Sequence, residues 1–439
     1  MFDYIVKNAR VIDPESGFDS VASVAVKDGV IAEIGENISA EAGEIIDGTG
    51  CVLAPGFIDI HAHEDAFPQP GVFILPIETA KAAQKEGVTT LVTGNCGLSS
   101  FPMSDYRREL EAAGLEIHTP FYVGNVALRF AVGLDYYQTA TPQQIARMAE
   151  LEAQAFADGA VGISFGLQYA PGTGFEEILA LAKVAAAHGK LMSVHMRYDY
   201  PEKAIETVRE VIDAAEQTGV SLQISHLAAN VYGGDNIARV AEMIEASPAD
   251  IACDMYPYNV WATDIASAVF DDGFEQFNFD VTDVEILTGE YAGQYCTQAL
   301  FEKMRANKEN ALCACHNAMP PEDIEACYLL PYCMLGSDSQ LCRDESGVYM
   351  GHPRSSSAAI KFLCDYVQTG KMSLRDGLAK LTCLPAKKLG FAKKGRLQVG
   401  MDADLVLFKP EALKVNATFG PNVCQTPPSG ICRVFIAKN

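Results

Sequence analysis

The 439-residue sequence is short of positive charge, with 33 Lys and Arg against 57 Asp and Glu and a net charge of −24. A nucleic-acid-binding protein needs clustered Lys and Arg to contact phosphates, so this balance argues against such a partner. It disfavours an anionic membrane surface for the same reason. Long apolar runs are also lacking, since no stretch of about 18 residues could span a bilayer. We therefore expect neither nucleic acid nor a membrane as a partner.

The sequence also lacks paired cysteine motifs, and its first residues do not resemble a secretory leader. Its 13 cysteines are scattered without a C-x-x-C pair. The first residues, Met1 to Val6, have no basic segment and are typical of a strand rather than a signal peptide. An odd number of cysteines in such a chain indicates reduced thiols. We expect a cytoplasmic protein in which most cysteines are small buried hydrophobic residues.

The distribution of apolar residues predicts an α/β fold. A hydrophobic share of 49% and a charged share of 21% indicate a folded protein with a large core. Residues 1–56 and 393–439 consist of short strand patterns, whereas in residues 57–392 short β-rich runs alternate with helical stretches. We predict a parallel barrel over 57–392, held between the two halves of a small β domain. Residues 265–330 are acidic and rich in Phe, and we expect a lid or a surface insertion there.

Residues of metal-ligand type follow five of the predicted barrel strands. They are His61, His63, Cys96, His195, His226 and Asp338. The chain has only eight histidines, and four of them occupy these positions. In a parallel barrel the carboxyl ends of the strands meet at one face, where the chemistry takes place. Imidazole and thiolate are good zinc ligands, so the pattern indicates a metal site assembled from separate strands.

Three other histidines fit different interpretations. His188 follows a run of alanines at the predicted C-terminus of a helix, where an imidazole can interact with the last carbonyl groups. We expect His118 on the surface, and we interpret His316, which follows Cys313-Ala314-Cys315, as lying outside the metal site.

The segment Ala54-Pro55-Gly56-Phe57-Ile58-Asp59 with His61-Ala62-His63 resembles the amidohydrolase superfamily. The resemblance implies a TIM-like (β/α)8 barrel with a small β-sandwich formed from both chain ends, and a metal-dependent hydrolase activity. Further motifs are similar to those of the N-acyl-D-amino-acid deacylases (D-aminoacylases), among them Gly94-Asn95-Cys96-Gly97, His195-Met196-Arg197 and His352-Pro353-Arg354. This narrower resemblance implies zinc-dependent hydrolysis of N-acyl-D-amino acids to a carboxylate and a free D-amino acid.

The resemblance also assigns roles to the strand-end residues. Many relatives bridge two metals with a carboxylated lysine, whereas the deacylases use a cysteine thiolate, and no lysine occupies a comparable strand end here. It implies one zinc ion held tightly by Cys96, His195 and His226. His61 and His63 would then serve a second, weaker or partly occupied site. Asp338 would be the catalytic acid and base.

An N-acyl amino acid carries a free carboxylate that the protein must recognise. Arg354 is a candidate because a guanidinium can bind a carboxylate through two hydrogen bonds, and Tyr258 could donate another. Arg197 directly follows a predicted ligand, so it could contact the substrate or support the ligands. Tyr169 is a candidate for the pocket lining. We expect one small-molecule substrate, and an assembly of identical subunits is compatible with the sequence.

The sequence departs from the deacylase pattern at two places near the implied pocket. Ala228 stands where the deacylases usually have a lysine, and Ser355–Ala359 replaces a segment that usually continues with Gly-Thr-Phe. These departures favour an alternative, a cyclic amide or ureide hydrolase of the hydantoinase or dihydroorotase type, whereas Gly-Asn-Cys-Gly opposes it. A second alternative is a non-catalytic binding or scaffold protein with the amidohydrolase fold. No ligand residue is lost, which argues against this alternative.

Overall fold

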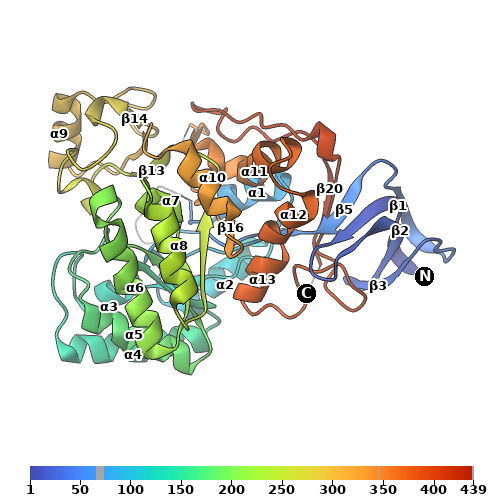
Figure 1. Cartoon of the computed structure of the whole chain (residues 1–439), viewed down its shortest axis with the longest axis horizontal. Coiled ribbons are helices and arrows are strands. Elements are labelled where there is room, and N and C mark those ends of the chain that lie inside the picture. The colour runs from blue at the N-terminus through green and yellow to red at the C-terminus, as the bar shows by residue number, and fades with distance from the viewer. Residues whose placement is uncertain (66–73, 345, 438–439) are drawn as a thin grey trace.

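The computed structural model describes residues 1–65, 74–344 and 346–437, so the last two residues of the predicted 393–439 segment lie outside it. A seven-stranded sheet joins the two ends of the chain, in the order β20-β19-β5-β1-β2-β3 with β4 beside β1. It lies at one end of the molecule, to the right in Figure 1. Its strands are β1 (Phe2–Asp13), β2 (Phe18–Lys27), β3 (Val30–Gly35), β4 (Ala42–Asp47), β5 (Val52–Pro55), β19 (Leu405–Phe408) and β20 (Ile431–Phe435).

Local turn chemistry and packing explain this sheet. Asp28 and Gly29 connect β2 to β3 with φ angles of 52° and 72°, the left-handed conformation that a tight hairpin turn requires. The ring of Tyr4 in β1 stacks on Phe435 in β20 at a centroid distance of 4.9 Å. Contacts of this kind bring the first and last strands of the chain together.

A second set of strands is parallel and almost fully buried. β6 (Phe57–Asp59) pairs with β7 (Val88–Leu91), and six further strands form a sheet in the order β16-β12-β11-β10-β9-β8. Parallel bridges from Thr93 to Phe121 and from Ala62 to Ser339 connect the two sheets. The six strands are β8 (Tyr122–Gly124), β9 (Gly162–Gly166), β10 (Leu191–His195), β11 (Ser221–Ile224), β12 (Ile251–Met255) and β16 (Cys333–Leu335). Burial on both faces explains why they read as continuous apolar runs.

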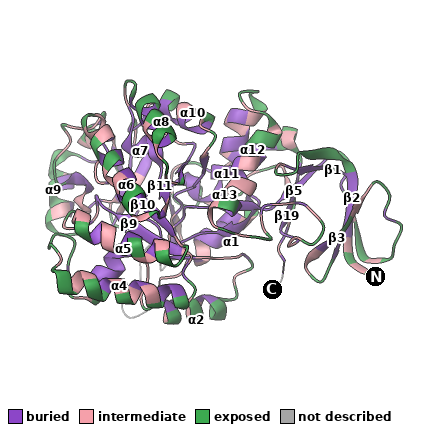
Figure 2. Ribbon diagram, turned by 60° about the horizontal axis from the view of Figure 1, so that its bottom comes forward, coloured by how far each residue is buried: buried purple, intermediate pink, exposed green. Residues whose placement is uncertain are grey.

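Helices lie between successive parallel strands and cover them. Figure 2 shows buried residues along β9, β10 and β11, and exposed residues on the outward faces of the helices. The helices are α1 (Ile77–Lys85), α2 (Met103–Ala113), α3 (Asn125–Ala131), α4 (Pro142–Ala157), α5 (Phe175–Ala187), α6 (Ala204–Thr218), α7 (Leu227–Asn230), α8 (Asn236–Ala246), α10 (Pro321–Leu329), α11 (Ala358–Phe362), α12 (Leu374–Leu381) and α13 (Cys383–Lys388). Within the described part of the chain, no helix is both long and apolar enough to cross a membrane.

The sequence of each helix accounts for its position. In α6, Val208, Val211, Ile212 and Ala215 recur at helical spacing and are buried, and Gly219 ends the helix with φ 72°. In α4, the side chain of Thr141 accepts a hydrogen bond from the backbone of Gln144, and the side chain of Gln144 contacts Thr141 in return.

An excursion over residues 261–315 separates β12 from α10. Its three antiparallel strands, in the order β13-β15-β14, are accompanied by α9, at the upper left of Figure 1. Their bounds are β13 (Trp261–Asp264), β14 (Val284–Ile286), β15 (Leu312–Cys315) and α9 (Gln298–Ala306). The aromatic rings of this segment pack on one another, with Phe274 and Phe301 at 5.0 Å. The excursion ends earlier than the expected 330, because α10 packs on the parallel sheet, where the Tyr328 hydroxyl donates to the Met255 carbonyl.

His118 connects the seven-stranded sheet to the parallel strands, and the expectation that it lies on the surface is wrong. Its Nε2 lies 3.0 Å from Asp404 Oδ1, and its side chain is 15% exposed. Lys394 Nζ lies 2.6 Å from the other oxygen of Asp404. The Asp404 carboxyl is buried, and the cation of Lys394 and the imidazole of His118 compensate the cost of burying it.

Candidate metal centre and active site

The six strand-end residues predicted as metal ligands or catalytic base come together in space. Two groups have ligand atoms that all lie within 4.8 Å of one another: His61, His63, Cys96 and Asp338 form one, and Cys96, His195 and His226 form the other. Cys96 belongs to both. All six follow or end parallel strands, and all but the half-buried His63 are buried. The convergence follows from the parallel arrangement, because the carboxyl ends of such strands meet at one edge.

Three of these residues have an unusual backbone conformation. Cys96, His226 and Asp338 have φ angles of 54°, 33° and 52°. Such angles cost about 1–3 kcal/mol each in non-glycine residues and concentrate at functional sites. The neighbouring Gly97 is required by space as well as by its φ of 77°, since a Cβ there would lie 2.6 Å from the backbone nitrogen of Gly166.

The thiol of Cys96 faces three imidazoles. Its Sγ lies 3.3 Å from His61 Nε2 and 3.7 Å from His226 Nε2. His195 Nδ1 in turn lies 2.9 Å from His226 Nε2. Burial opposes ionisation of the thiol, but His61, His195 and His226 outweigh it and lower the pKa of Cys96 well below its ordinary value. A thiolate is the form that binds metal.

The carboxyl of Asp338 is held between imidazole and guanidinium. One oxygen lies 2.9 Å from His63 Nε2 and 3.5 Å from His61 Nε2, and the other lies 2.8 Å from Arg354 Nη2. Burial alone would raise the pKa of Asp338, but Arg354 and His63 outweigh it and hold the pKa well below its ordinary value. Asp338 is therefore ionised and able to accept a proton.

A second layer of side chains, which does not lie at strand ends carrying ligand residues, orients the imidazoles. Asp254 Oδ1 lies 3.1 Å from His61 Nδ1 and 2.9 Å from the backbone nitrogen of His226. The other two contacts are Gln168 Oε1 with His195 Nε2 at 2.8 Å and Asn230 Oδ1 with His226 Nδ1 at 3.0 Å. Asp254 is the one charged residue in the otherwise apolar strand β12, and this could have marked it as a functional residue.

This donor set fits zinc. Each of these three imidazoles uses one ring nitrogen for an orienting contact, which leaves the other nitrogen directed at the common centre. Thiolate sulfur and imidazole nitrogen are the ligands that zinc prefers. The residues able to hold a metal are thus those of the two groups that share Cys96.

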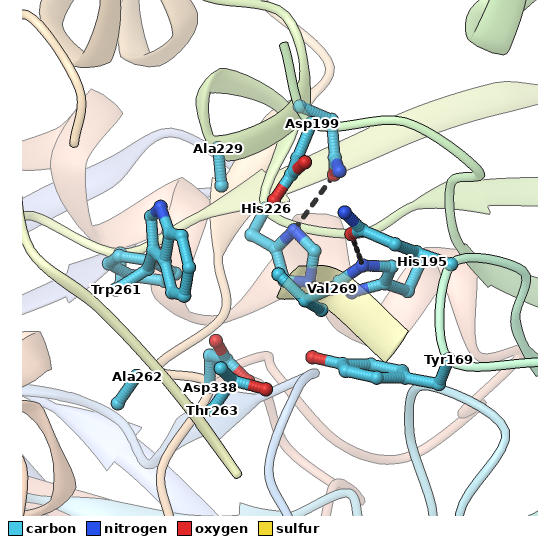
Figure 3. Close-up of a pocket in the computed structure, with 13 residues that line it drawn as sticks. Tyr169, His195, Asp199, His226, Ala229, Trp261, Ala262, Thr263, Val269 and Asp338 are labelled. Carbon is cyan, nitrogen blue, oxygen red and sulfur yellow. Dashed lines mark hydrogen bonds between the residues drawn. The ribbon is translucent and has the colours of Figure 1, made fainter. Parts of the chain in front are cut away.

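A small cavity, about 310 Å³ with its solvent-open part, lies beside the ligands. Figure 3 shows His195, His226, Asp338 and Tyr169 around it, with Trp261 from the excursion on the opposite side. Its lining consists of Gln168, Tyr169, His195, Asp199, His226, Ala229, Asn230, Tyr256, Trp261, Ala262, Thr263, Val269 and Asp338. A wider cavity, about 1890 Å³ with its solvent-open part, shares Tyr169 and Asp338 with it and is also lined by His63 and Arg354.

The four predicted substrate-binding residues are placed differently. Tyr169 lines both cavities, with its ring 4.5 Å from that of His195, and Arg354 lines the wider one. Neither cavity is lined by Arg197 or Tyr258. Arg197 Nη2 lies 2.8 Å from Glu210 Oε1, and the Tyr258 hydroxyl lies 2.8 Å from Ser357 Oγ. Each polar group is thus engaged by the protein itself.

The two departures from the deacylase pattern also lie outside the cavity linings. Ala228 is fully buried in α7. The hydroxyls of Ser355, Ser356 and Ser357 donate to the backbone carbonyls of Gln340, Cys424 and Pro353. These hydrogen bonds stabilise a turn. Ala228 and the three serines therefore give less information about the substrate than the sequence suggested.

Two further histidines, His188 and His316, have local partners. His188 Nδ1 contacts the Val184 carbonyl at the C-terminus of α5, as predicted. His316 Nε2 lies 2.8 Å from Glu285 Oε2, outside both ligand groups, as predicted.

Comparison with known proteins agrees with this arrangement. Residues 52–429 match the amidohydrolase family. The D-aminoacylase of Alcaligenes xylosoxydans xylosoxydans is 30% identical over 95% of this chain and 90% of its own length. The chain belongs to the amidohydrolase family.

Solved structures resemble this amidohydrolase over its whole length. A D-aminoacylase, described with a binuclear metal centre and one-metal activation, has a TM-score of 0.85 at 27% identity, covering 100% of this chain and 96% of that one. The N-acyl-D-glutamate deacylase of Bordetella bronchiseptica, solved with zinc and a phosphonate inhibitor, has a TM-score of 0.86 at 26% identity, covering 99% and 95%. A D-hydantoinase, at TM-score 0.63 and 16% identity over 99% and 94%, shows the fold alone.

Proposed function

We propose that this amidohydrolase hydrolyses the amide bond of N-acyl-D-amino acids, giving a carboxylate and a free D-amino acid. The observation that carries the proposal is Cys96, whose thiol belongs to two ligand groups, one of which contains Asp338. The whole-length likeness to D-aminoacylase and to N-acyl-D-glutamate deacylase supports the substrate class.

The fold proposal accompanies the functional one. We infer that the eight parallel strands close into a (β/α)8 barrel over residues 57–392, with residues 1–56 and 393–439 forming one small β domain. The bridges Thr93–Phe121 and Ala62–Ser339 support closure, because they connect the two edges of the six-stranded sheet to β7 and β6. The seven-stranded sheet supports the β domain.

We propose zinc as the cofactor. Cys96, His195 and His226 would hold one ion tightly, and His61 and His63 with Cys96 would form a second, weaker site. The binuclear centre and one-metal activation described for D-aminoacylase support this division. When bound, zinc acts as a Lewis acid on the amide carbonyl and makes water more acidic.

Asp338 and Arg354 supply the remaining chemistry. Asp338 takes a proton from the attacking water and returns it to the leaving nitrogen, because an amide expels nitrogen poorly unless it is protonated. Arg354 uses Nη2 for Asp338, while its buried Nε and Nη1 have no hydrogen-bond partner among the described residues. Nη1 shares the end of the guanidinium with Nη2, so it can donate a hydrogen bond to the substrate carboxylate beside Asp338.

Neither alternative gains support from a specific contact. The cyclic amide or ureide hydrolase depended on Ala228 and the Ser355 segment, which lie outside both cavity linings. A non-catalytic scaffold would not need two groups of metal-ligand residues next to an ionised Asp338. The cytoplasmic location is supported by 13 free thiols, and an assembly of identical subunits stays a prediction.

Kinetics with a substrate panel test the proposal. The zinc-loaded full chain is incubated with N-acetyl-D- and N-acetyl-L-amino acids, hydantoin and dihydroorotate, and zinc per chain is measured in parallel. We expect turnover of the N-acetyl-D-amino acids only, and activity that is lost with a chelator and restored by zinc. Turnover of a cyclic substrate alone would support the first alternative, and zinc binding without turnover would support the second.

A further inference from the structure

Asp199 is a buried carboxyl in the wall of the smaller cavity, and the proposed reaction does not use it. Asp199 is only 6% exposed to solvent, and it lines the cavity together with His195 and His226. The side chain of Gln168 belongs to the same lining and lowers the pKa of Asp199, against the larger effect of burial. Asp199 Oδ1 is buried and has no hydrogen-bond partner among the described residues. Figure 3 shows the carboxyl directed into the space framed by the labelled side chains.

The charge of this carboxyl is not compensated in the cavity. The described lining contains no Lys or Arg, and its other carboxyl is Asp338, which is already held by Arg354 and His63. Burial raises the pKa of Asp199 to about 7. A buried carboxyl without a cation is unfavourable, so such a group in a cavity wall marks a ligand contact.

The other walls suit an aliphatic chain. Trp261, Val269 and Ala229 contribute apolar surface to the same cavity. The ring of Trp261 could cover a run of methylene groups and favour a cation at its end. The wider cavity, about 1890 Å³ with its solvent-open part, shares Tyr169, Ala262, Thr263 and Asp338 with this lining, so Asp199 lies beside the space that a substrate would enter.

We propose that Asp199 is a specificity-determining residue that selects N-acyl-D-amino acids whose side chain ends in a cation, as in lysine or ornithine. The inference rests on the proposed deacylase function and names its substrate class. The ammonium group of such a side chain would supply Asp199 Oδ1 with the donor it lacks. A side-chain carboxylate would instead meet two acidic residues and no Lys or Arg in the described lining, so acidic substrates are disfavoured.

A merely structural role makes a different prediction. Asp199 could serve only to position the side chain of Gln168, whose Oε1 lies 2.8 Å from His195 Nε2. Loss of Asp199 would then weaken zinc binding and slow every substrate by the same factor. Selectivity between substrates, measured together with zinc content, separates the two roles.

The test compares three substrates on three proteins. Zinc-loaded wild type, Asp199→Asn and the matched control Asp47→Asn are assayed for kcat/KM with N-acetyl-D-lysine, N-acetyl-D-norleucine and N-acetyl-D-glutamate. Asp47 is exposed in β4 of the seven-stranded sheet and lines neither cavity, so its change controls for net charge. We expect wild type to prefer the lysine over the norleucine derivative at least tenfold, Asp199→Asn to reduce that ratio at least tenfold, and Asp47→Asn to preserve it.

Three results would overturn the inference. One is a wild type that prefers norleucine or glutamate while it hydrolyses all three derivatives, which leaves the deacylase proposal intact. Another is an Asp199→Asn variant that loses zinc or activity equally on all substrates, since this is the structural role. The third is the absence of turnover on every N-acyl-D-amino acid, which removes the deacylase function itself. Zinc content and melting temperature of each variant show that it is folded.

Discussion

Arg354 Nη2 lies 2.8 Å from Asp338 Oδ2, and the guanidinium lies 4.5 Å from the centre of the Tyr256 ring. The proposed carboxylate anchor thus directly contacts the proposed catalytic base. A substrate carboxylate that accepts a hydrogen bond from the unpartnered Nη1 of Arg354 would therefore lie close to Asp338. This coupling explains why both residues are buried beside the ligand groups.

The first prediction concerns Asp338→Asn. The amide cannot accept the proton of water, so kcat should fall by about 100-fold to 10,000-fold, the range of general acid–base catalysis. The group of Cys96, His195 and His226 does not include Asp338, so at least one zinc per chain should remain. Stopped assays of kcat and elemental analysis measure the two effects. Near-full turnover would contradict the assignment.

The second prediction concerns Arg354→Ala. A hydrogen-bonded charge is lost, so KM for an N-acetyl-D-amino acid should rise by about tenfold to 100-fold. KM for the corresponding N-acetyl amine, which lacks the carboxylate, should change much less. Steady-state kinetics on both substrates give the ratio. Any fall in kcat shared by both substrates reports the separate loss of the contact with Asp338.

The matched control is Arg197→Ala, which breaks the pair with Glu210 and removes no group from either cavity lining. It should leave the ratio of the two KM values unchanged. If Arg197→Ala shifted the ratio and Arg354→Ala did not, the carboxylate would bind at Arg197, as the sequence had also allowed.

The third prediction concerns Cys96→Ala. Because the thiol belongs to both ligand groups, its removal should lower zinc at both sites, and elemental analysis should find less than about a tenth of a zinc per chain. The control is Cys364→Ala, whose half-buried sulfur contacts the Leu413 carbonyl and no ligand residue. Full zinc occupancy in Cys96→Ala would disprove the thiolate ligand.

The convergence of the ligand residues could be predicted from the sequence because it depends only on strand direction. Once His61, Cys96 and His226 each follow a parallel strand, their side chains must meet at the same edge. The place of Arg197 could not be predicted in this way. β10 ends at His195, so the alternation of a strand does not extend to residue 197, and a later helix supplies Glu210 as its partner.

Contacts between segments that are far apart in the sequence could not be predicted either. Asp254 holds His61 across 193 residues of sequence, and His118 meets Asp404 across 286. No local periodicity encodes either pair. Asn230 is the exception, because it lies four residues after His226, a spacing that places two side chains on one face of the short helix α7.

The fourth prediction concerns Asp404 and pH. Burial opposes ionisation, but His118 and Lys394 outweigh it and lower the pKa of Asp404 below its ordinary value. A carboxyl with a lowered folded pKa stabilises the fold fully above its unfolded pKa, and this contribution is lost as pH falls through the folded pKa. Asp404→Asn should reduce stability at pH 7 by about 1.5–3 kcal/mol.

Thermal unfolding of wild type and Asp404→Asn from pH 7 to pH 3 measures this effect. The difference in melting temperature should be largest near neutral pH and shrink as Asp404 becomes protonated. Asp105→Asn is a suitable control, because that carboxylate lies on α2 with 38% of its side chain exposed and pairs with Arg108. A difference that stays constant over this pH range would refute the electrostatic explanation.

The fifth prediction concerns Glu152 in α4, whose carboxyl is fully buried. Neither oxygen has a hydrogen-bond partner among the described residues, and burial raises the pKa of Glu152 well above its ordinary value. Below the unfolded pKa both states are protonated, and no penalty arises from ionisation. As pH rises, the unfolded state ionises while the folded state stays neutral, so stability is lost with rising pH.

Glu152→Met, which fills similar space without a polar group, should therefore raise stability by about 1–3 kcal/mol. The gain in melting temperature should be larger at pH 8 than at pH 5, because only the wild type loses stability over that interval through this group. Glu150→Gln provides the control on the same helix, since Glu150 is exposed and pairs with Arg147. A Glu152→Met variant that is less stable than wild type at pH 8 would mean that the buried carboxyl has a partner that compensates it.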